Sequence, residues 1–497
     1  MASSKKLKIL FVTSEVVPFI KTGGLADVSS ALPQKLQELG HQVRIVVPKY
    51  GAIDERKYKI HEVVRLKELT TKIGEKDVVF SLRSSFLVGQ KVRVQIYFLD
   101  NEEYFGNRPS LYINPLTGND FEDNDERFIL LAKSVFELIS KLGWVPDIIH
   151  CNDWQCGLIP AYQKTLFKDD ETFKSIKTLF TIHNLSFQGE FPKNSFFKTG
   201  LPADLNSTKG VIHDGKINFM KTGLTFADHI NTVSETYAKE ICKDKEISSG
   251  LQTVLCKRQK DIAGIINGID SSIWNPEKDK HIAKKYSAKN LEYKLDNKKA
   301  LAEKFGFEFD ADTPIIGMIG RLSDSKGYDL VKDAFPELMK LNLHLIILGT
   351  GEKSYHKFFD SQLNKYRKKF SCYLGFDDEL AHLIEAGSDM FLMPSKTEPC
   401  GLNQMYSLIY GTVPIVHETG GLADTVENYN EKTKTGTGFV FKKYDHNEML
   451  KEIKRAIKIY SKNKDDWQKI MKEGMKQNFT WLSSAKNYVN LYKDIIS

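Results

Sequence analysis

Short apolar runs and longer amphipathic segments alternate along the chain from its start. The run 7–13 is apolar and rich in branched side chains, as is typical of a strand buried on both faces of a sheet. The segment 25–39 spaces its apolar residues like a helix, and Gly40 follows it in the position favoured just past a helix end. A second apolar run, 43–48, completes a strand–helix–strand unit. The pattern therefore predicts an α/β architecture with a parallel sheet.

The same alternation continues through both halves of the chain. Strand-length apolar runs recur at 92–100, 147–153, 177–184, 228–234, 314–320, 343–349, 371–375, 390–394 and 413–418. Helical patterns lie between them, at 121–142 in the first half and at 377–387 and 400–411 in the second. Two such series predict two doubly wound, Rossmann-like domains that face each other across a cleft, and such a cleft is the default ligand site.

The junction between the two halves is predicted within 255–275. We expect a first domain over 1–263, a second over 264–480, and a C-terminal helix over 481–497 that packs back on the first domain. The Lys-rich stretch 278–304 is predicted to form a solvated helical surface rather than a binding tail.

Composition narrows the function classes. The 497 residues carry a formal net charge of +7, with 41% hydrophobic and 27% charged residues, which suits small anionic ligands and argues against a nucleic-acid partner. No run approaches the roughly 18 apolar residues of a membrane span, and the N-terminus lacks the apolar segment of a signal peptide. Six scattered cysteines without C-x-x-C spacing predict reduced thiols in the cytoplasm, not zinc or disulfides.

Two loops share the sequence TGGLAD, and each joins a predicted strand to a helix. In the first, Lys21 precedes Gly23 and Gly24, and Asp27 lies in the first turn of the helix; the second copy is Thr419–Asp424. Glycines let a backbone approach a ligand closely, and a helix N-terminus offers unpaired N–H groups to an anion. A duplicated turn would also explain the repeat, but we favour two helix starts that face a phosphate or a sugar, one from each domain.

Charged residues follow two strands of the second domain. Arg321 and Lys326 lie in the loop after 314–320, where ligands bind in doubly wound folds. A planar guanidinium and a mobile ammonium suit a diphosphate, and they can neutralise it as a leaving group. The alternative is a loop with two ordinary surface charges. Glu398, held before a proline at a helix start, is placed to meet a hydroxyl-rich ligand or to cap the helix.

His183 ends the strand 177–184, where a side chain can face the cleft, although a lone histidine is more often structural. The acidic segment 123–125 has the spacing of a metal-binding D-x-D, but a helix cap with acids in the first turn explains it better. The sequence contains no G-x-G-x-x-G loop, no Walker motif and no nucleophile triad. We therefore expect no metal and no cofactor.

Together these motifs resemble the bacterial-type glycogen synthases and plant starch synthases, a glycosyltransferase family of the two-domain GT-B fold. The resemblance covers essentially the whole chain and rests on segments in a fixed order, 9–28, 150–155, 180–189, 266–276, 320–330, 348–352, 394–402 and 419–426. It implies a retaining transfer of glucose from ADP-glucose, or less often UDP-glucose, to the non-reducing end of an α-1,4-glucan such as glycogen. A metal ion, a nucleic acid and a membrane play no part in that reaction.

The resemblance also assigns roles. It implies four catalytic residues, with Arg321 and Lys326 on the diphosphate, Glu398 on the glucose ring and His183 beside the reacting sugar. It places Asp153 and Trp154 toward the acceptor and the aromatic ring of Phe376 on the nucleotide base. The remaining substrate-binding residues that it implies are Lys21, Gly23, Gly24, Asp27, Asn184, Asn267, Cys400, Gly401, Leu402, Thr419, Gly420 and Gly421.

The implied mechanism needs no covalent nucleophile, because the leaving phosphate can assist the acceptor hydroxyl on the same face of the sugar. Two positions depart from related sequences: Tyr406 stands where many relatives of the fold carry a second glutamate, and Asn403 where many synthases carry Thr or Ser.

Two other functions remain as alternatives. One is a retaining GT-B transferase that acts on a small sugar, and the other is a catalytically silent protein that binds glucan or nucleotide.

Overall fold

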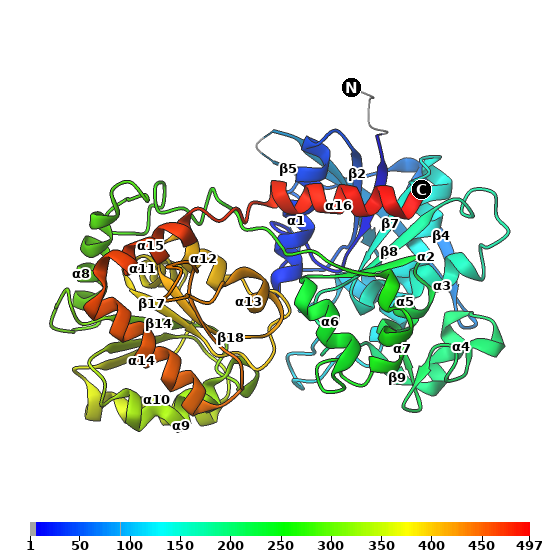
Figure 1. The fold of residues 1–497 in the computed structure, drawn as a ribbon. Helices are drawn as coiled ribbons and strands as arrows, with labels where there is room; N and C mark the ends of the chain where they lie inside the picture. The colour runs from blue at the N-terminus through cyan, green and yellow to red at the C-terminus, as the bar shows by residue number, and fades with distance from the viewer. Residues whose placement is uncertain (1–5, 90) are drawn as a thin grey trace. The chain divides into compact units, whose positions relative to one another are not determined.

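The computed structural model of the protein describes residues 6–89 and 91–497. The basic start of the chain, 1–5, from which no signal peptide was expected, lies outside the described residues. The chain divides into two compact units (Figure 1). The first runs from the start of the described chain to Val233, continues over Ala238–Ile265 and ends with Trp481–Ser497; the second comprises Ser234–Tyr237 and Ile266–Thr480.

The first unit is built on a ten-stranded sheet in the order β13-β12-β8-β7-β1-β2-β6-β5-β3, with β4 paired to β5. The strands from β13 to β6 are parallel, whereas β5 runs antiparallel to β6, β3 and β4. The bounds are β1 Lys8–Val12, β2 Gln42–Pro48, β3 His61–Glu62, β4 Leu69–Ile73, β5 Lys76–Val88, β6 Arg93–Asp100, β7 Ile148–Asn152, β8 Lys177–Ile182, β12 His229–Thr232 and β13 Ile262–Gly264. The strand order reverses between β1 and β7, and a doubly wound sheet binds its ligands beyond the carboxyl ends of the strands at such a point.

Helices and a small sheet complete the first unit. The helices are α1 Gly24–Glu38, α2 Asn124–Leu142, α3 Leu158–Lys164, α4 Phe196–Thr199, α5 Phe219–Phe226, α7 Gln252–Lys257, α16 Trp481–Ile496 and the greater part of α6 Glu235–Lys243, whose first residues belong to the second unit. A three-stranded antiparallel sheet is formed by β9 Glu190–Pro192, β10 Ile212–His213 and β11 Lys216–Asn218. The C-terminal helix α16 lies beside α1, the first helix of the chain (Figure 1).

A buried chain of hydrogen bonds ties α16 to the sheet of the first unit. His150 on β7 is fully buried, and its two ring nitrogens lie 2.7 Å from the Tyr492 hydroxyl and 2.6 Å from the Thr181 hydroxyl. Thr181 donates in turn to Asn231, whose amide lies 3.2 Å from the Tyr488 hydroxyl. Because each partner is buried, losing one would leave a polar group without compensation.

The second unit has a six-stranded parallel sheet in the order β16-β15-β14-β17-β18-β19. Its strands are β14 Ile315–Ile319, β15 His344–Leu348, β16 Phe370–Tyr373, β17 Met390–Met393, β18 Val413–His417 and β19 Phe439–Phe441. Counted from β14, this is the order 3-2-1-4-5-6 of a Rossmann fold, with the reversal between β14 and β17. The predicted α/β fold of two Rossmann-like domains is confirmed.

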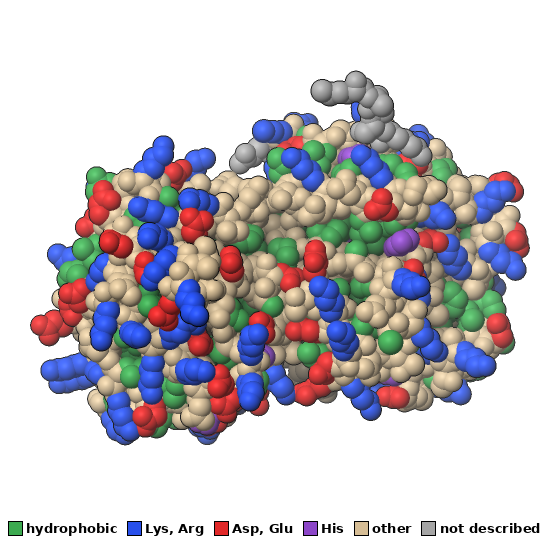
Figure 2. Space-filling view, in the orientation of Figure 1, with side chains coloured by type: hydrophobic (Ala, Val, Ile, Leu, Met, Phe, Trp, Pro, Cys, Tyr) green, Lys and Arg blue, Asp and Glu red, His purple; other side chains and the backbone are tan. Residues whose placement is uncertain are grey.

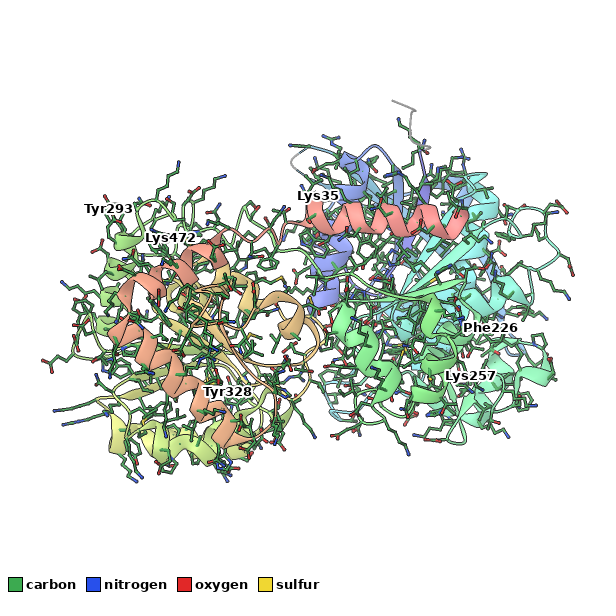
Figure 3. The ribbon with its side chains drawn as sticks, in the orientation of Figure 1. Lys35, Phe226, Lys257, Tyr293, Tyr328 and Lys472 are labelled. Atoms are coloured by element: carbon green, nitrogen blue, oxygen red, sulfur yellow. The ribbon has the colours of Figure 1, made fainter. Side chains whose placement is uncertain are left out.

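Two apolar clusters cover the two faces of this sheet. The helices of the second unit are α8 Lys294–Lys304, α9 Tyr328–Leu338, α10 Lys353–Tyr366, α11 Asp378–Gly387, α12 Asn403–Ile409, α13 Gly420–Thr425, α14 His446–Lys462 and α15 Lys464–Met475. One cluster joins α9, α10, α14 and α15 to the sheet, and it includes Tyr328, which is labelled in Figure 3. The other joins α8, α11, α12 and α13 to the opposite face.

The prediction of a solvated helical surface over 278–304 is wrong in part. Helix α8 covers only the end of that stretch, and two of its lysines are buried. The ammonium of Lys294 donates to the carbonyl of Ala386 at 2.7 Å, and that of Lys298 pairs with Asp389 at 3.0 Å. A lysine can be buried when its charge meets such partners, and the composition of the stretch did not reveal them.

Candidate functional site

The loop after β1 is held in place by a buried glutamate. Glu15 is 4% exposed, and its carboxylate accepts hydrogen bonds from the backbone of Thr22, from the Thr22 hydroxyl at 2.9 Å and from the Gly23 N–H at 3.2 Å. Burial raises the pKa of Glu15 above its usual value. The carboxylate thereby fixes the backbone of the Thr-Gly-Gly turn that begins α1. Sequence reasoning missed Glu15, because a lone acid in a loop gives no signal.

Lys21 and Asp27, two residues predicted to bind substrate, pair with each other in this loop. The ammonium of Lys21 lies 2.8 Å from the Asp27 carboxylate, and the two side chains are 53% and 40% exposed. A pair this exposed contributes little to stability. The structure therefore keeps a mobile positive charge at the start of α1.

The next strands along the chain bring Asp153 and His183 together. Asp153 follows β7, and its carboxylate accepts the N–H of His183, which follows β8, at 2.8 Å. The backbone of Asp153 has a φ of 55°, an unusual value for a residue other than glycine. Burial raises the pKa of Asp153 to about 7. An uncommon backbone and a perturbed carboxyl together mark a candidate functional residue.

The ring of His183 is neutral and has a defined tautomer. Burial lowers the pKa of His183 to about 3. The Asn152 amide donates to the carbonyl of Val12 at 2.9 Å, so its Oδ1, which lies 2.9 Å from His183 Nε2, acts as the acceptor. Nε2 therefore carries the ring proton, and Nδ1 keeps a lone pair that can accept a hydrogen bond from a sugar hydroxyl.

Trp154 and Asn184, the neighbours of this pair, have mainly structural contacts. Trp154 is 8% exposed, and its ring packs edge-on against Phe128 at 4.8 Å. A Cβ at Gly189 would lie 2.2 Å from the Trp154 ring, so a glycine is required there. The Asn184 side chain accepts the N–H of Ser186 at 2.9 Å, which shapes the loop after β8.

In the second unit, Lys326 and Glu398 meet at the point where the strand order reverses. Lys326 follows β14 and Glu398 follows β17, and the Lys326 ammonium lies 2.5 Å from the Glu398 carboxylate. Ser395 donates to the same carboxylate oxygen at 3.1 Å. The Glu398 side chain is 8% exposed and that of Lys326 is 32% exposed. The buried carboxylate therefore holds the lysine in place, while the lysine side chain remains partly accessible to solvent. An ammonium has three donors and can bind a phosphate while it keeps this pair.

The second TGGLAD copy supports the loop that carries Glu398. A Cβ at Gly420 would lie 2.0 Å from the carbonyl oxygen of Glu398, and one at Gly421 would lie 1.9 Å from that of Cys400. The Gly421 N–H donates to the Glu398 carbonyl at 3.0 Å. Thr419 is buried. These glycines are thus required by backbone packing beneath Glu398.

The first copy of the motif differs. A Cβ at Gly24 would meet nothing within 4 Å, and one at Gly23 would come no closer than 3.9 Å to the Glu15 carboxylate. Neither residue has a positive φ. The fold therefore does not demand glycine at either position, and the open space leaves room for a ligand to approach the backbone.

Four further predicted residues border these loops of the second unit. Arg321 is exposed, and within the described part of the chain its guanidinium has no hydrogen bond or ion pair. Phe376, after β16, is 87% exposed, which is unusual for a large apolar ring. Asn267 is 8% exposed, and burial raises the pKa of the Cys400 thiol to about 12. The Asn267 Oδ1 is buried without a partner among the described residues.

The turn that follows Glu398 is shaped by local contacts. Gly401 has a φ of +71°, and Leu402 precedes α12 as its N-cap. Asn403 donates its amide to the carbonyl of Ile319 at 2.9 Å, which ties the start of α12 to the end of β14. Asn403, where many synthases carry Thr or Ser, thus links the turn after Glu398 to the loop that follows β14.

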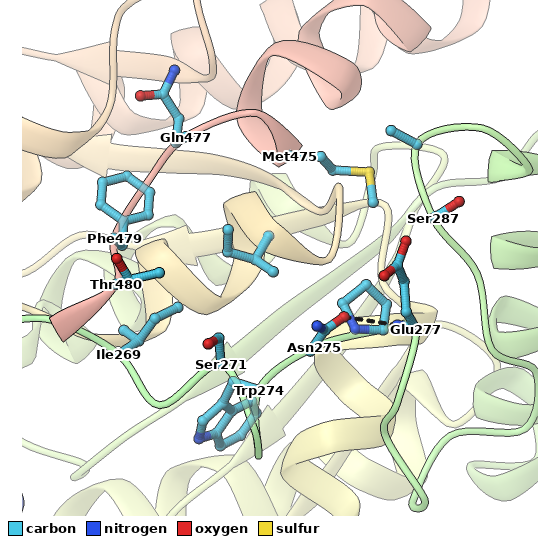
Figure 4. A pocket seen from close by; sticks show the side chains of 13 residues that line it. Ile269, Ser271, Trp274, Asn275, Glu277, Ser287, Met475, Gln477, Phe479 and Thr480 are labelled. Atoms are coloured by element: carbon cyan, nitrogen blue, oxygen red, sulfur yellow. Dashed lines mark hydrogen bonds between the residues drawn. The ribbon is translucent and has the colours of Figure 1, made fainter. Parts of the chain in front are cut away.

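A separate pocket of about 290 Å³ lies in the second unit and contains none of the predicted site residues (Figure 4). Trp274 is on its wall, but His382 and Tyr406 stack on the two faces of the indole, at 3.8 and 4.0 Å between ring centroids. The covered indole cannot stack on a sugar. Tyr406, which stands where many relatives of the fold carry a second glutamate, therefore belongs to this structural stack.

The described residues include no group of three or more His, Cys, Asp or Glu side chains that could hold a metal ion. The acids at 123–125 serve other purposes: Asp123 pairs with Arg108, and Asp125 pairs with Lys198 at 2.8 Å. Lys and Arg side chains are interspersed with Asp and Glu over the face seen in Figure 2. None of the helices described is both long enough and apolar enough to cross a membrane.

Two family models match the chain, one on each unit. The model described as starch synthase catalytic domain matches residues 8–257, and the one described as glycosyl transferases group 1 matches residues 300–474. The first match covers the loops with Glu15, Asp153 and His183, and the second those with Lys326 and Glu398.

Similar proteins are known over the full length. A glycogen synthase of Treponema denticola is 42% identical over 495 residues, which is 99% of each chain, and one of Thermotoga maritima is 41% identical over 493 residues, again 99% of each. Among solved structures, the catalytic domain of starch synthase IV from Arabidopsis thaliana, bound to ADP and acarbose, superposes with a TM-score of 0.86 at 29% identity and covers 99% of this chain and 100% of its own. A sucrose-phosphate synthase from Thermosynechococcus elongatus, at 17% identity and a TM-score of 0.57 over 99% of each chain, shows the shared fold alone.

Proposed function

The chain belongs to the starch synthase catalytic-domain family of glycosyltransferases, and on that premise we propose that it is a glycogen synthase that transfers glucose from ADP-glucose to the non-reducing end of an α-1,4-glucan with retention of configuration. The observation that carries the proposal is the pairing of Lys326 with Glu398 where the strand order of the second unit reverses. The similar starch synthase bound to ADP and acarbose supports an adenine nucleotide and a glucan.

In this proposal the second unit binds the donor. Arg321 and Lys326 bind the diphosphate, and their charges stabilise it as it departs, which is usually the largest catalytic contribution in such a site. Glu398 accepts hydrogen bonds from glucose hydroxyls, and Phe376 stacks on the base. The two cations supply the charge stabilisation that a metal ion would otherwise give, so the reaction needs no metal or other cofactor.

The first unit then contributes to the sugar and the acceptor. Neutral His183 accepts a hydrogen bond from the transferred glucose through Nδ1, and Asp153 fixes the His183 backbone. As the C–O bond to the diphosphate breaks, the acceptor hydroxyl attacks from the same face, and its proton passes to a leaving phosphate oxygen. The new glycosidic bond therefore keeps the α configuration. The cytoplasmic location expected from the sequence stays a prediction.

The test is a donor competition over glycogen. ADP-glucose and UDP-glucose are offered at equal concentration, and glucose incorporation is measured with and without a chelator. We expect extension mainly from ADP-glucose, no effect of the chelator, and product that an α-1,4-specific glucosidase removes completely. Extension from UDP-glucose alone would refute ADP-glucose as the donor. A product that resists the glucosidase would refute retention of the α configuration. Transfer to a small sugar but not to glycogen would favour the alternative transferase, and binding without turnover a silent binding protein.

A further inference from the structure

A pocket of about 400 Å³ opens on the first unit at the edge of the sheet opposite the candidate site. It is lined by the first residues of β2 and β6, whereas Asp153 and His183 follow the last residues of β7 and β8. Since these four strands are parallel, their amino ends lie at one edge of the sheet and their carboxyl ends at the other. The pocket is therefore separate from the residues of the proposed reaction.

The lining of this pocket is basic. Among the residues that the structure describes, it is formed by Lys6, Gln37, Gly40, His41, Gln42, Val43, Arg44, Phe86, Arg93 and Gln95, which include three cations and no carboxylate. Arg44, Gln95 and Phe86 are directly paired on β2, β6 and β5, so they form one row across three strands. Arg93 lies two residues before Gln95 and shares its face of the sheet. The register thus places both guanidiniums on the same surface.

Arg44 is held rigidly without an anionic partner. Its guanidinium carbon lies 4.3 Å from the ring centre of Trp144, and its Nη1 lies 3.3 Å from the Tyr97 hydroxyl. Burial lowers the pKa of Arg44. Within the described residues no carboxylate pairs with Arg44, Arg93 or Lys6, whereas the nearby Lys35 on α1, labelled in Figure 3, pairs with Glu38 at 2.9 Å. Unpaired, partly buried positive charge is unfavourable and is relieved by a bound anion.

His41 adds a neutral donor to the pocket. It is 6% exposed, and its Nδ1 accepts the backbone N–H of Leu7 at 3.1 Å. Burial and the charge of Lys493 lower the pKa of His41, so the ring is neutral and Nε2 carries its proton. That Nε2–H has no partner within the described chain, although His41 lines the pocket. The His41 side chain is buried as a whole, but its Nε2 reaches the pocket opening and can donate to an acceptor that binds there.

We propose that this pocket binds a phosphate monoester, with the phosphate held by Arg44, Arg93, Lys6 and the Nε2–H of His41. Two guanidiniums match phosphate oxygens in geometry as well as in charge. Phe86, whose ring is 47% exposed, offers an apolar surface to the organic part of the ester. The ligand class is thus a small phosphorylated metabolite or, if Phe86 plays no part, free inorganic phosphate.

The experiment is calorimetric titration of the full-length protein with inorganic phosphate, with a hexose monophosphate and with glucose as the uncharged blank. We expect the hexose monophosphate to bind, and Arg44→Gln and Arg93→Gln each to weaken it at least about tenfold, as loss of a charged hydrogen bond implies. Phe86→Ala should weaken the hexose monophosphate but leave inorganic phosphate unchanged. If Phe86→Ala changed the binding of neither ligand, Phe86 would play no part and the site would take the free ion.

Matched variants separate this site from the rest of the molecule. Arg367→Gln removes one exposed guanidinium from the second unit and should leave binding unchanged. Lys326→Ala should also leave it unchanged, because the pocket is not part of the donor loops. Arg93 is itself exposed, so the Arg93→Gln variant should fold even where Arg44→Gln does not. Absence of binding by the wild type at about 10 mM, or undiminished binding by Arg93→Gln, would overturn the proposal.

Discussion

Lys326 combines a buried carboxylate partner with an ammonium that remains accessible to solvent. The partner fixes the position of the charge, so little reorganisation is needed when a diphosphate binds. The Lys326 side chain is only partly buried, at 32% exposure, so its removal should leave the fold of the second unit intact. Without Lys326, the Glu398 carboxylate would still accept the hydrogen bond from the Ser395 hydroxyl.

We therefore expect Lys326→Ala to lower turnover about 100-fold or more, because a preorganised charge on the leaving group is lost. The melting temperature should fall slightly, since a buried carboxylate loses one partner at a cost of about 1–3 kcal/mol. Initial rates over glycogen and thermal unfolding measure the two effects. Lys340→Ala removes an exposed lysine that pairs with Glu337 and serves as the control. Turnover within threefold of wild type would exclude the diphosphate role.

Asp153 makes stability depend on pH. Its pKa is about 7 in the folded protein against 3.8 for the free side chain, so between these values the folded state holds more protons than the unfolded state. The free energy of unfolding must then fall as pH rises through this window, and the penalty is complete above pH 7. Asparagine accepts the same backbone hydrogen bond without the charge, and it tolerates positive φ better than most residues.

We expect Asp153→Asn to stabilise the protein by about 2 kcal/mol at pH 8 and to have no effect near pH 4, where both side chains are neutral. This magnitude is about half the full linkage value, because Asp153 as a whole residue is only partly buried and solvent can relax around the charge. Urea unfolding at the two pH values measures the change, with the exposed Asp204→Asn as control. A stabilisation that is equal at both pH values would show that the buried charge is not its cause.

At the scale of elements, one six-residue motif begins two helices for different physical reasons. At α13 the glycines admit the backbone of the Glu398 loop, whereas at α1 a side chain would meet open space. Both helices follow a strand of a doubly wound sheet, so the sequence alone makes the copies look equivalent. The distances at Gly24 and Gly421 distinguish them and lead to opposite expectations.

Gly24→Ala should keep or raise stability, by up to about 1 kcal/mol, because alanine lowers the entropy of the unfolded chain. It should lower kcat/KM if a ligand approaches the backbone there. Gly421→Ala should destabilise the second unit by about 3 kcal/mol, since its Cβ would lie 1.9 Å from the Cys400 carbonyl oxygen. Urea unfolding and initial rates measure both variants. If Gly24→Ala and Gly421→Ala lowered the free energy of unfolding equally, the two copies of the motif would not differ in the way proposed.

The parallel strands could be predicted from sequence because burial on both faces leaves an uninterrupted apolar run, as in β1 and β14. The antiparallel part of the first unit was missed. In β5 the buried residues alternate at Val78, Phe80 and Leu82, but the alternation changes phase before Leu87, which hides the strand. The three residues of β19 are too few to give a period.

The charged residues of the candidate site could be proposed from sequence because they follow predicted strands. Their supports could not. Glu15 and Asn152 act through contacts between segments far apart in the chain, for example Asn152 with Val12. Such partners become visible only when the sheet brings β1, β7 and β8 together.

At the scale of the whole molecule, the chain completes its first unit last. It leaves that unit after Ile265, forms the second, and returns with α16 after Thr480. The outgoing and returning segments pair, with the Ile269 N–H donating to the Phe479 carbonyl at 2.7 Å. The second unit is thus continuous apart from the short segment Ser234–Tyr237, whereas the first depends on a helix more than two hundred residues away in sequence.

Besides Ala485, five larger apolar side chains of α16 are buried in the first unit, namely Trp481, Tyr488, Val489, Tyr492 and Ile495. At roughly 2 kcal/mol for each, their burial amounts to about 10 kcal/mol, which is comparable with the whole stability of a domain. Loss of the helix also leaves His150 and Asn231 without their tyrosine partners. A fragment of residues 1–265 should therefore fail to fold cooperatively.

Residues 266–480 alone should unfold in one cooperative transition, and so should residues 1–265 joined through a Gly/Ser linker to residues 481–497. Circular dichroism during heating measures all three proteins, and the joined fragment is the matched control for 1–265. Replacing both Tyr488 and Tyr492 by Ala in the joined fragment should lower its melting temperature strongly, because two fully buried rings are lost and His150 and Asn231 lose their tyrosine partners. If residues 1–265 alone melted at the same temperature as the joined fragment, α16 would be dispensable, and its burial would have to be offset by unfavourable terms of similar size.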